Sequence, residues 1–584
     1  MTTVEDVNER MLTALIQLRG ALQGVTLPLD VSGVEEHRTT LRELVDQLED
    51  YAIPRQMTLE APLLAVVGGS TGAGKSTLVN SIVGRRVTAP GVLRPTTRSP
   101  VLVHHPDDKK WFGQDRLLPE LERVEHATDD PDALQLVPNE SLPPGLAILD
   151  APDVDSVEER NRQLAAQLLA AADLWLFVTS AARYADEVPW GFLKKAAERS
   201  TAVAIVLDRT PEEATHTVAT HLARMLASRG LKDSPLFIVP EGKVDDEGLL
   251  PADQVAEIRT WLSSLAEDAE ARGVVVKQTL EGAIRTLNRR AYGVADAHAE
   301  QVRAAEQLRA DADAAYERAT AALSEEAADG TLLRGEVLAR WQEFVGTGEL
   351  LRSLETRVGW LRDRLVNAVK GKPQQAERVT LAVESGLETL ILEHAEAAAE
   401  RAEAAWRQSE GGRTLLERGD GDLGRASRDL RRRAEAAVRD WQREVLEMVR
   451  REGADKRATA RFLAFGVNGL SVALMIVVFA HTAGVTGAEA GIAGGSAVLG
   501  QKLLEAVFGD QAVRSLAERA RRSLDERVRA LLDEERSRYR SLTDALDLRP
   551  ETADQVREAA RRIDDLRYAA SKLGKAPDGT EGAL

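Results

Sequence analysis

The 584-residue sequence predicts an α/β domain followed by a long antiparallel helical region. Three observations predict this. Short apolar runs alternate with helical stretches between residues 59 and 262, a pattern typical of a mostly parallel sheet with helices on both faces. A glycine-rich run, 69–76, lies between one apolar run and the start of a helix. From residue 263 onward the pattern is almost wholly helical and rich in Ala, Glu and Arg.

Composition limits the classes of partner and chemistry. The formal net charge is -18, and such a surface repels a phosphate backbone, so we expect no nucleic-acid partner. The absence of cysteine excludes disulfides, thiolate metal sites and cysteine catalysis. Aromatic residues make up only 4% of the chain, which is typical of long helices. The first ten residues are acidic and polar, unlike a secretory signal.

Residues 1–58 are predicted to be helical, because apolar residues recur there at helical spacing. Pro28 and Gly33 are expected to divide this segment into two helices. Since these helices precede the α/β domain, we expect them to pack against the helices that follow it.

Within the α/β domain, six apolar runs are expected to be strands. They are 63–67, 101–104, 146–149, 174–178, 203–207 and 236–239. In an open parallel sheet the ligand-binding loops follow the carboxyl ends of the strands, so we expect the functional residues there.

The first expected strand leads into a phosphate-binding loop. Residues 69–76 fit G-x-x-x-x-G-K-[ST], in which glycines let backbone N–H groups point at phosphate oxygens and the following helix adds partial positive charge. Lys75 is the candidate for neutralising the β- and γ-phosphates, and Ser76 for holding Mg²⁺. The predicted nucleotide-binding residues of this loop are Gly69, Ser70, Thr71, Gly72, Ala73, Gly74, Lys75, Ser76 and Thr77.

Three further segments supply candidates. Asp150 ends an apolar run and is the expected second protein partner of Mg²⁺. The segment 94–100 has two interpretations: a switch loop that offers a threonine hydroxyl to Mg²⁺, or an ordinary proline-rich loop. Asp208 and Arg209 follow another strand, at the place that GTPases use for base recognition.

A long uncharged stretch predicts a membrane hairpin over residues 456–508. Residues 462–480 would form about 28 Å of helix at ~1.5 Å per residue, near the ~30 Å core of a bilayer, and arginines and lysines precede them. The alternative is a buried hairpin inside a soluble helical bundle. The candidate lipid-contacting residues are Phe462, Phe465, Leu470, Leu474, Ile476 and Val478.

This order of parts resembles the dynamin superfamily, especially bacterial dynamin-like proteins and mitofusins, over nearly the whole chain. The resemblance implies N-terminal neck helices, a P-loop GTPase domain, a helical neck and trunk, a membrane hairpin, a return helix and a flexible tail. The corresponding ranges are 1–58, 59–262, 263–455, 456–508, 509–575 and 576–584.

Two motifs match the family and two depart from it. The phosphate-binding loop matches, although Gly72 lacks the polar side chain that usually assists hydrolysis. The sequence Thr-Arg-Ser-Pro from Thr97 resembles the family's first switch, which implies that Thr97 holds Mg²⁺ and positions the attacking water. The family's third motif is Asp-x-Pro-Gly, and residues 150–153 correspond to it. Here Asp153 replaces the glycine, whose N–H binds the γ-phosphate in the family, and brings a like charge towards that phosphate. In the fourth, Pro211 replaces the acid that pairs with guanine, so either Asp208 takes that role or base selectivity is relaxed.

The resemblance implies a GTPase that uses GTP and Mg²⁺ to remodel a membrane from the cytoplasmic face of the cell membrane. It also implies membrane lipids as partners, and self-association through the GTPase domains or pairing with a second dynamin-like protein. Two alternatives remain open at this stage: a non-catalytic, nucleotide-gated membrane scaffold, and a P-loop ATPase with a membrane anchor.

Overall fold

The structure is a computed structural model, and the chain forms two units. The first unit comprises Met1–Leu27, Gly33–Glu300 and Arg549–Leu584, and the second comprises Pro28–Ser32 and Gln301–Leu548. The structure describes residues 4–88, 99–114, 116–128, 130–156, 158–199, 201–329, 331–333, 335–345, 373–419, 421–454, 466–479 and 493–573.

The first unit contains an eight-stranded sheet in the order β3-β4-β2-β5-β1-β6-β7-β8. The strands β5, β1, β6, β7 and β8 are parallel to one another, whereas β2 pairs antiparallel with β5, and β4 and β3 follow the direction of β2. The strand bounds are β1 Leu63–Gly69, β2 Val101–His104, β3 Glu122–Val124, β4 Ala133–Pro138, β5 Leu146–Asp150, β6 Leu174–Ser180, β7 Ala202–Thr210 and β8 Leu236–Pro240. The mostly parallel sheet is therefore confirmed.

All six predicted strands are present, as β1, β2, β5, β6, β7 and β8. The prediction missed β3 and β4. The strand β3 is short and lacks a buried residue, so it carries no apolar run for a pattern to detect.

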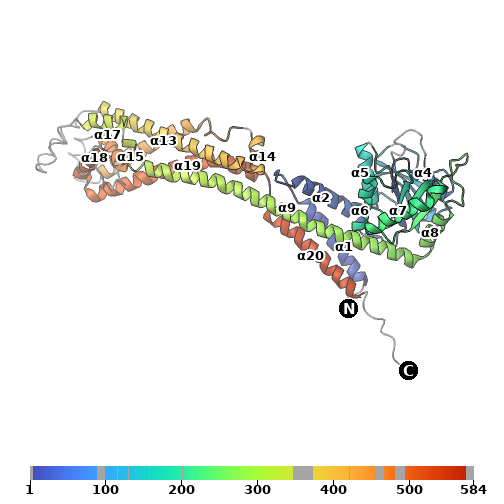
Figure 1. The fold of residues 1–584 in the computed structure, drawn as a ribbon. Helices are drawn as coiled ribbons and strands as arrows, with labels where there is room; N and C mark the ends of the chain where they lie inside the picture. Colours follow the sequence, from blue (N-terminus) through green and yellow to red (C-terminus); the bar gives the residue numbers. More distant parts are fainter. Residues whose placement is uncertain are drawn as a thin grey trace, which may run out of the picture. The chain divides into compact units, whose positions relative to one another are not determined.

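Helices cover both faces of the sheet, as Figure 1 shows for α4 to α8. Ala65 and Val67 of β1 share a buried cluster with Leu78 of α4 and Ile258 of α8. On the other face, a β-carbon at Gly68 would lie 2.9 Å from Leu169 of α5. The helices here are α4 Lys75–Val83, η2 Pro106–Trp111, α5 Glu159–Ala170, α6 Glu187–Arg199, η3 Glu212–Ala214, α7 Thr215–Ser228 and α8 Ala256–Glu267.

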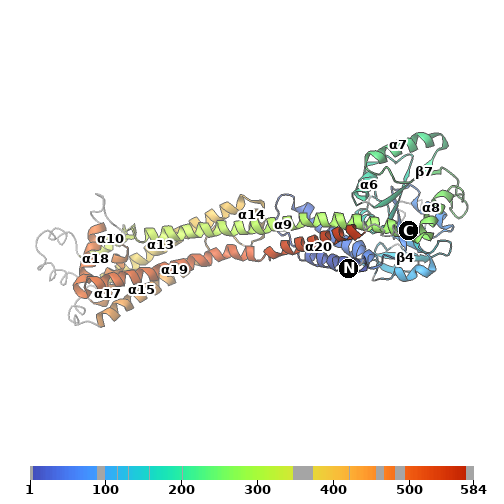
Figure 2. The ribbon, with the colours of Figure 1, turned by 90° about the horizontal axis from the view of Figure 1, so that it is seen from below.

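The N-terminal helices pack against the C-terminal helix α20 (Pro550–Leu573) and against the sheet. As predicted, the chain breaks between α1 (Val4–Gln23) and α2 (Val34–Gln47), and α1 packs on α20 (Figures 1 and 2). A π-helix, η1 (Leu48–Ala52), and α3 (Ile53–Met57) then lead into β1.

A buried carboxylate joins these helices to the sheet. Asp173 accepts hydrogen bonds from Tyr51 Oη at 3.1 Å, Arg55 Nε at 3.0 Å and the backbone N–H of Leu64 at 2.9 Å. Its backbone carbonyl accepts a hydrogen bond from Thr279 of α9 (Ala269–Glu326) at 3.1 Å. One side chain therefore ties η1, α3 and β1 together.

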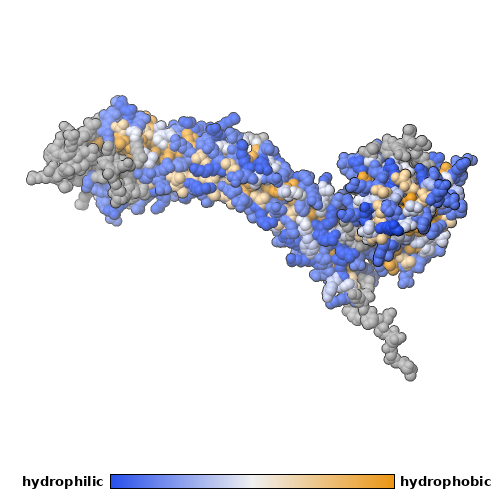
Figure 3. Space-filling view, in the orientation of Figure 1, coloured by the Kyte–Doolittle hydropathy of each residue, from blue (hydrophilic) through white to orange (hydrophobic). Residues whose placement is uncertain are grey.

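The second unit is a bundle of long helices around aromatic side chains. The indole N–H of Trp406 donates to Leu308 O at 2.9 Å, and that of Trp441 donates to Ala520 O at 2.8 Å. Its helices, besides the end of α9, are η4 Thr331–Leu333, α10 Glu336–Val345, α13 Pro373–Arg407, α14 Glu410–Arg418, α15 Leu430–Ala454, α17 Val467–Phe479, α18 Ala493–Phe508 and α19 Asp510–Asp544. In the space-filling view the visible face of this unit is largely hydrophilic, with apolar residues scattered among the polar ones (Figure 3).

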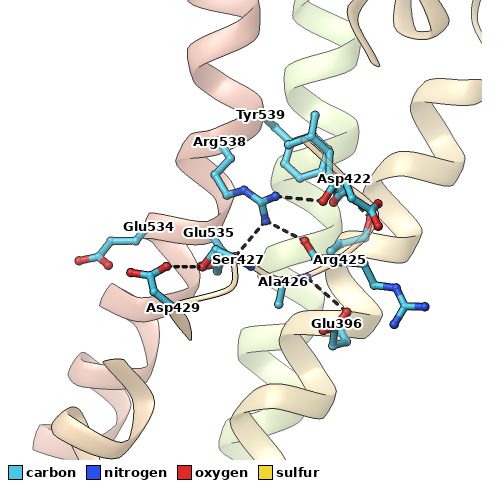
Figure 4. Close-up of polar contacts among 12 residues, drawn as sticks. Glu396, Asp422, Arg425, Ala426, Ser427, Asp429, Glu534, Glu535, Arg538 and Tyr539 are labelled. Atoms are coloured by element: carbon cyan, nitrogen blue, oxygen red, sulfur yellow. Dashed lines mark hydrogen bonds and ion pairs between the residues drawn. The ribbon is translucent and has the colours of Figure 1, made fainter. Parts of the chain in front are cut away.

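A buried glutamate fastens the segment between α14 and α15 to α19 (Figure 4). Glu535 is fully buried and accepts the N–H of Ser427 at 2.8 Å and Arg538 Nη1 at 3.1 Å. Arg538 also donates to Arg425 O at 2.8 Å. The buried charge is thus paired and hydrogen-bonded, as a charge in a protein interior requires.

The expectation of lipid-facing residues is corrected for four positions. Leu470, Leu474, Ile476 and Val478 of α17 are buried within the second unit, at 0–2% exposure, and α17 packs against η4, α13, α15, α18 and α19. Phe462 and Phe465 lie outside the described residues. For these four residues of α17 the structure agrees with the alternative interpretation, burial inside a helical bundle.

The contacts of α17 agree with this correction. Within the described part of the chain, none of the helices combines the length and hydrophobicity needed to cross a membrane. Instead α17 packs closely on α18, where a β-carbon at Gly500 would lie 3.3 Å from Ala473 O.

Replacing a buried side chain of α17 tests its place in the core. We expect Ile476→Ala to lower the free energy of unfolding of the second unit by about 2–5 kcal/mol, because it leaves a cavity. Urea unfolding in lipid-free buffer, followed by tryptophan fluorescence, measures the change. The control is Leu381→Ala in α13, where the leucine is 58% exposed and the expected change is within about 0.5 kcal/mol. Equal stability of Ile476→Ala and the parent protein would contradict the buried position.

Candidate functional site

Two glycines of the phosphate-binding loop lie so close to neighbouring atoms that neither position has room for a side chain. A β-carbon at Gly69 would lie 1.9 Å from Val178 O on the neighbouring strand β6. A β-carbon at Gly74 would lie 2.0 Å from Asp208 Oδ2, and Gly74 has a left-handed φ of 95°. Glycine is therefore required at both positions, and the loop delivers Lys75 to the first turn of α4.

Lys75 lies inside the loop and is already paired with an acid. Its side chain is 5% exposed, and Nζ donates to Gly69 O and Ser70 O at 3.1 Å each. The third partner of Nζ is the carboxylate of Asp153, the residue that replaces a glycine in the family motif. The ammonium group expected to meet the β- and γ-phosphates thus contacts a protein carboxylate in this structure.

A second acid contacts the loop two residues later. Asp155 Oδ1 accepts the backbone N–H of Thr71 at 2.6 Å and the Thr71 hydroxyl at 2.7 Å. Arg183 Nη1 holds the other oxygen of Asp155 at 2.7 Å. Asp153 and Asp155 therefore accept two of the donors that a phosphate-binding loop offers to a nucleotide.

Two of the three predicted metal-binding residues, Ser76 and Asp150, lie in contact, and Thr88 joins them at the same carboxylate. Ser76 Oγ donates to Asp150 Oδ2 at 2.7 Å, and Thr88 Oγ1 donates to the same oxygen at 2.8 Å. Parallel pairing of β1 with β5 sets Asp150 opposite Val67, just before the loop. Asp150 is fully buried, which raises the pKa of its carboxyl group.

This group of oxygens fits Mg²⁺. The second oxygen of Asp150 is buried and has no hydrogen-bond partner among the described residues. Carboxylate and hydroxyl oxygens suit this ion, which is usually held in NTPases by one or two protein groups together with nucleotide phosphates and water. A cluster of three or more His, Asp or Glu residues suited to a metal is absent from the described residues, and such a site does not need one.

The predicted base-recognition residues lie at the carboxyl end of β7. Asp208 is 3% exposed, and its Oδ1 accepts the backbone N–H of Arg209 at 2.8 Å. Arg209 has a positive φ of 49°. Burial raises the pKa of Asp208 to about 6. With its other oxygen facing Gly74, Asp208 belongs to the wall of the phosphate-binding loop.

The structure thus brings the loop residues, Asp150 and Asp208 together at one edge of the sheet, whereas Thr97 lies outside the described residues. The sequence reasoning missed three residues at this site: Thr88, Asp155 and Arg183. The repeated aspartates at 150, 153 and 155 offered a signal for Asp155. Thr88 and Arg183 carry no local signal, because folding alone brings them to the acids.

Removing the charge of Asp153 tests whether it competes with phosphate. We expect Asp153→Asn to strengthen nucleotide binding about tenfold, because Lys75 then loses its internal anion. Anisotropy of a fluorescent GTP analogue measures the affinity. Asp132→Asn is a matched control, since it removes an exposed acid paired with Arg160 in the same unit. Weaker binding by Asp153→Asn would show that Asp153 supports the site instead.

Comparisons with known proteins give one curated relative and several solved structures. No protein-family model matches the chain. A probable transmembrane GTPase, FZO-like and chloroplastic, from Arabidopsis thaliana is 25% identical over 188 residues, which are 30% of this chain and 19% of that protein. The match thus spans about a fifth of the relative's length.

The solved structures are distant in sequence. A chain of an oligomerised bacterial dynamin pair, described as a mechanism for long-range sensing and tethering of membranes, is 10% identical with a TM-score of 0.38, covering 96% of this chain and 95% of that chain. LeoA, a bacterial dynamin GTPase from ETEC, is 13% identical with a TM-score of 0.24, covering 98% and 99%. The similarity to the FZO-like GTPase agrees with the resemblance to the dynamin superfamily over the 188 residues that match.

Proposed function

We propose that this protein binds GTP with Mg²⁺ at the loop 69–77 and hydrolyses it to drive a conformational change that remodels a membrane. One observation carries the catalytic half of this proposal: Lys75, Ser76 and Asp150 lie together at the end of β1, with Ser76 Oγ 2.7 Å from the buried carboxylate of Asp150. P-loop NTPases use this combination of lysine, serine and aspartate side chains to bind the phosphates and the metal ion.

Each residue has a stated role. The loop's N–H groups and Lys75 bind the phosphates, and Ser76 and Asp150 hold the Mg²⁺, which neutralises charge on the β- and γ-phosphates. Thr97 is proposed as a further metal ligand and as the residue that orients the attacking water. Positioning and charge stabilisation carry most of phosphoryl transfer, so the site does not depend on a strong general base.

The membrane half rests on the sequence of the second unit. A basic stretch at 450–461 precedes the uncharged stretch 462–480, and anionic lipid surfaces attract such basic segments. Because α17 is buried, the bundle must open before its apolar side chains reach lipid. We propose association with the cytoplasmic face of the cell membrane, self-association through the GTPase domains or pairing with a second dynamin-like protein, and no nucleic-acid partner.

A second candidate function is a non-catalytic, nucleotide-gated membrane scaffold. The contact of Asp153 with Lys75 favours the scaffold function, because a carboxylate beside the γ-phosphate repels the negative charge of the phosphate groups during hydrolysis. A third, a P-loop ATPase with a membrane anchor, is favoured by Pro211, which stands where GTPases have the guanine-pairing acid.

Phosphate release separates hydrolysis from scaffolding. With purified full-length protein, GTP and Mg²⁺, we expect release that rises when anionic liposomes are added. Lys75→Ala is expected to reduce it at least about a hundredfold, since charge stabilisation of that size is typical for one catalytic contact. Lys195→Ala, which removes a lysine of α6 from the same unit, is the control. Absence of release with and without liposomes would leave the scaffold as the function.

The ionisation of Asp208 tests base selection. If its carboxylate accepts guanine N–H groups, GTP is preferred over ATP above the pKa of about 6, where Asp208 is charged, and the preference falls as the pH drops through 6. We expect the GTP-to-ATP affinity ratio to fall about tenfold between pH 7.5 and 5, and Asp208→Asn to lower it at pH 7.5. Protonation of the triphosphate affects the affinities for GTP and ATP equally, so it cancels in their ratio. A ratio that is constant with pH and unchanged in Asp208→Asn would favour relaxed selectivity.

A further inference from the structure

A cavity away from the nucleotide site lies between the N-terminal helices and the α/β domain, within the first unit. It has a volume of about 560 Å³ and is bounded by α2 and η1 on one side and by α5 and α6 on the other. Trp175 of β6 and Phe192 of α6 give it an apolar wall. None of the roles assigned above to the phosphate-binding loop, Asp150 or Asp208 involves these walls.

One buried side chain at this cavity has unsatisfied hydrogen-bonding groups. Gln47, at the end of α2, is 3% exposed, and neither its amide nitrogen nor its amide oxygen has a hydrogen-bond partner among the described residues. A buried amide without partners costs about 1–3 kcal/mol, so such a group in a cavity wall points to a ligand. The π-helix that follows, a feature frequent at functional sites, begins at the next residue, Leu48.

A carboxylate lies one turn further along the same wall. Asp50 is 3% exposed, and its Oδ2 accepts a hydrogen bond from Gln167 Nε2 of α5 at 2.8 Å. Burial, together with the nearby carboxylates of Glu120 and Asp46, raises the pKa of Asp50 to about 7, although the hydrogen bond from Gln167 opposes this rise. The three acids thus repel one another in a partly desolvated space, and a cation placed among them would relieve that repulsion.

The remaining charges of the cavity neutralise these acids only in part: Arg42 opposes the rise in the pKa of Asp46 and Lys195 also lines the cavity, so five acids stand against three cations. Glu43 is paired with Arg290, and Asp132 is paired with Arg160. A cluster of three or more acids or histidines suited to a metal is absent from the described residues. An organic cation matches the site better, because its N–H groups satisfy both carboxylate and amide oxygens and its carbon chain packs against aromatic rings.

We propose that this cavity binds a small aliphatic polyamine, with one primary ammonium group held between Asp50 and Gln47 Oε1. The methylene chain lies against Trp175 and Phe192, and the second ammonium group meets Asp46 and Glu120. Such a ligand bridges α2 and η1 to α5 and α6. The proposal is independent of the function proposed for the nucleotide site.

Isothermal titration of the full-length protein with putrescine at pH 8 tests this site. We expect saturable binding at one site, weakened about tenfold by Asp50→Asn, which keeps the shape and removes the charge. Gln47→Met, which keeps the length and removes the amide, is expected to weaken it about threefold. Glu43→Gln is the matched control: it removes an equal charge already paired with Arg290, and binding is expected to stay within about twofold.

The pH dependence gives a second, variant-free readout. Putrescine stays fully charged, so binding is expected to weaken about tenfold from pH 8 to pH 6, as Asp50 takes up a proton around pH 7. Histidine is absent from the residues that line the cavity. The charged groups facing Asp50 from the surrounding elements are Arg42, Glu43, Asp46, Glu49, Glu120, Asp132, Arg160 and Lys195.

Three results would each overturn the proposal. The first is absence of putrescine binding at pH 8. The second is equal weakening by Asp50→Asn and Glu43→Gln, which indicates general attraction to an acidic surface. The third is displacement of putrescine by an equal concentration of tetramethylammonium, which has charge but no N–H donors and so cannot satisfy Gln47 or Asp50.

Discussion

The first unit depends on the ion pair and hydrogen bonds that the buried carboxylate of Asp173 forms. This carboxylate is buried just before β6, where it pairs with Arg55 and accepts the N–H of Leu64 in β1. A buried charge is tolerated when it is paired and its remaining lone pairs are hydrogen-bonded, and removing one partner leaves the other uncompensated. Asp173 contacts the start of β1 at Leu64, and β1 ends at Gly69, where the phosphate-binding loop begins. The N-terminal helices and the loop are therefore attached to the same strand.

The segment after β5 gives the nucleotide site its particular character. Three aspartates within six residues contact the loop. Asp150 accepts a hydrogen bond from Ser76, Asp153 forms an ion pair with Lys75, and Asp155 accepts a hydrogen bond from Thr71. A nucleotide that binds as proposed exchanges contacts with these carboxylates as its phosphates enter.

The helix α17 shows why an apolar sequence does not by itself identify a membrane segment. A protein interior and a lipid core both exclude water, so either accepts an uncharged helix. In the second unit the helices α13, α15 and α19 pack against α17, and the side chains of α17 from Leu470 to Phe479 are buried. The apolar seam of α19, with Val513, Leu516 and Leu524 buried, packs against α17.

The sequence by itself determined most of the strands and the place of the loop. Six strands followed from apolar runs, and the residues from Gly69 to Ser76 followed from a spacing that the backbone geometry of phosphate binding requires. These signals are local, so a single sequence reveals them. Tertiary structure decided the rest: the contacts of Asp153 and Asp155 with the loop, the convergence of Thr88 on Asp150, and the burial of α17. Each joins segments that are separated along the chain, and packing alone determines which of them meet.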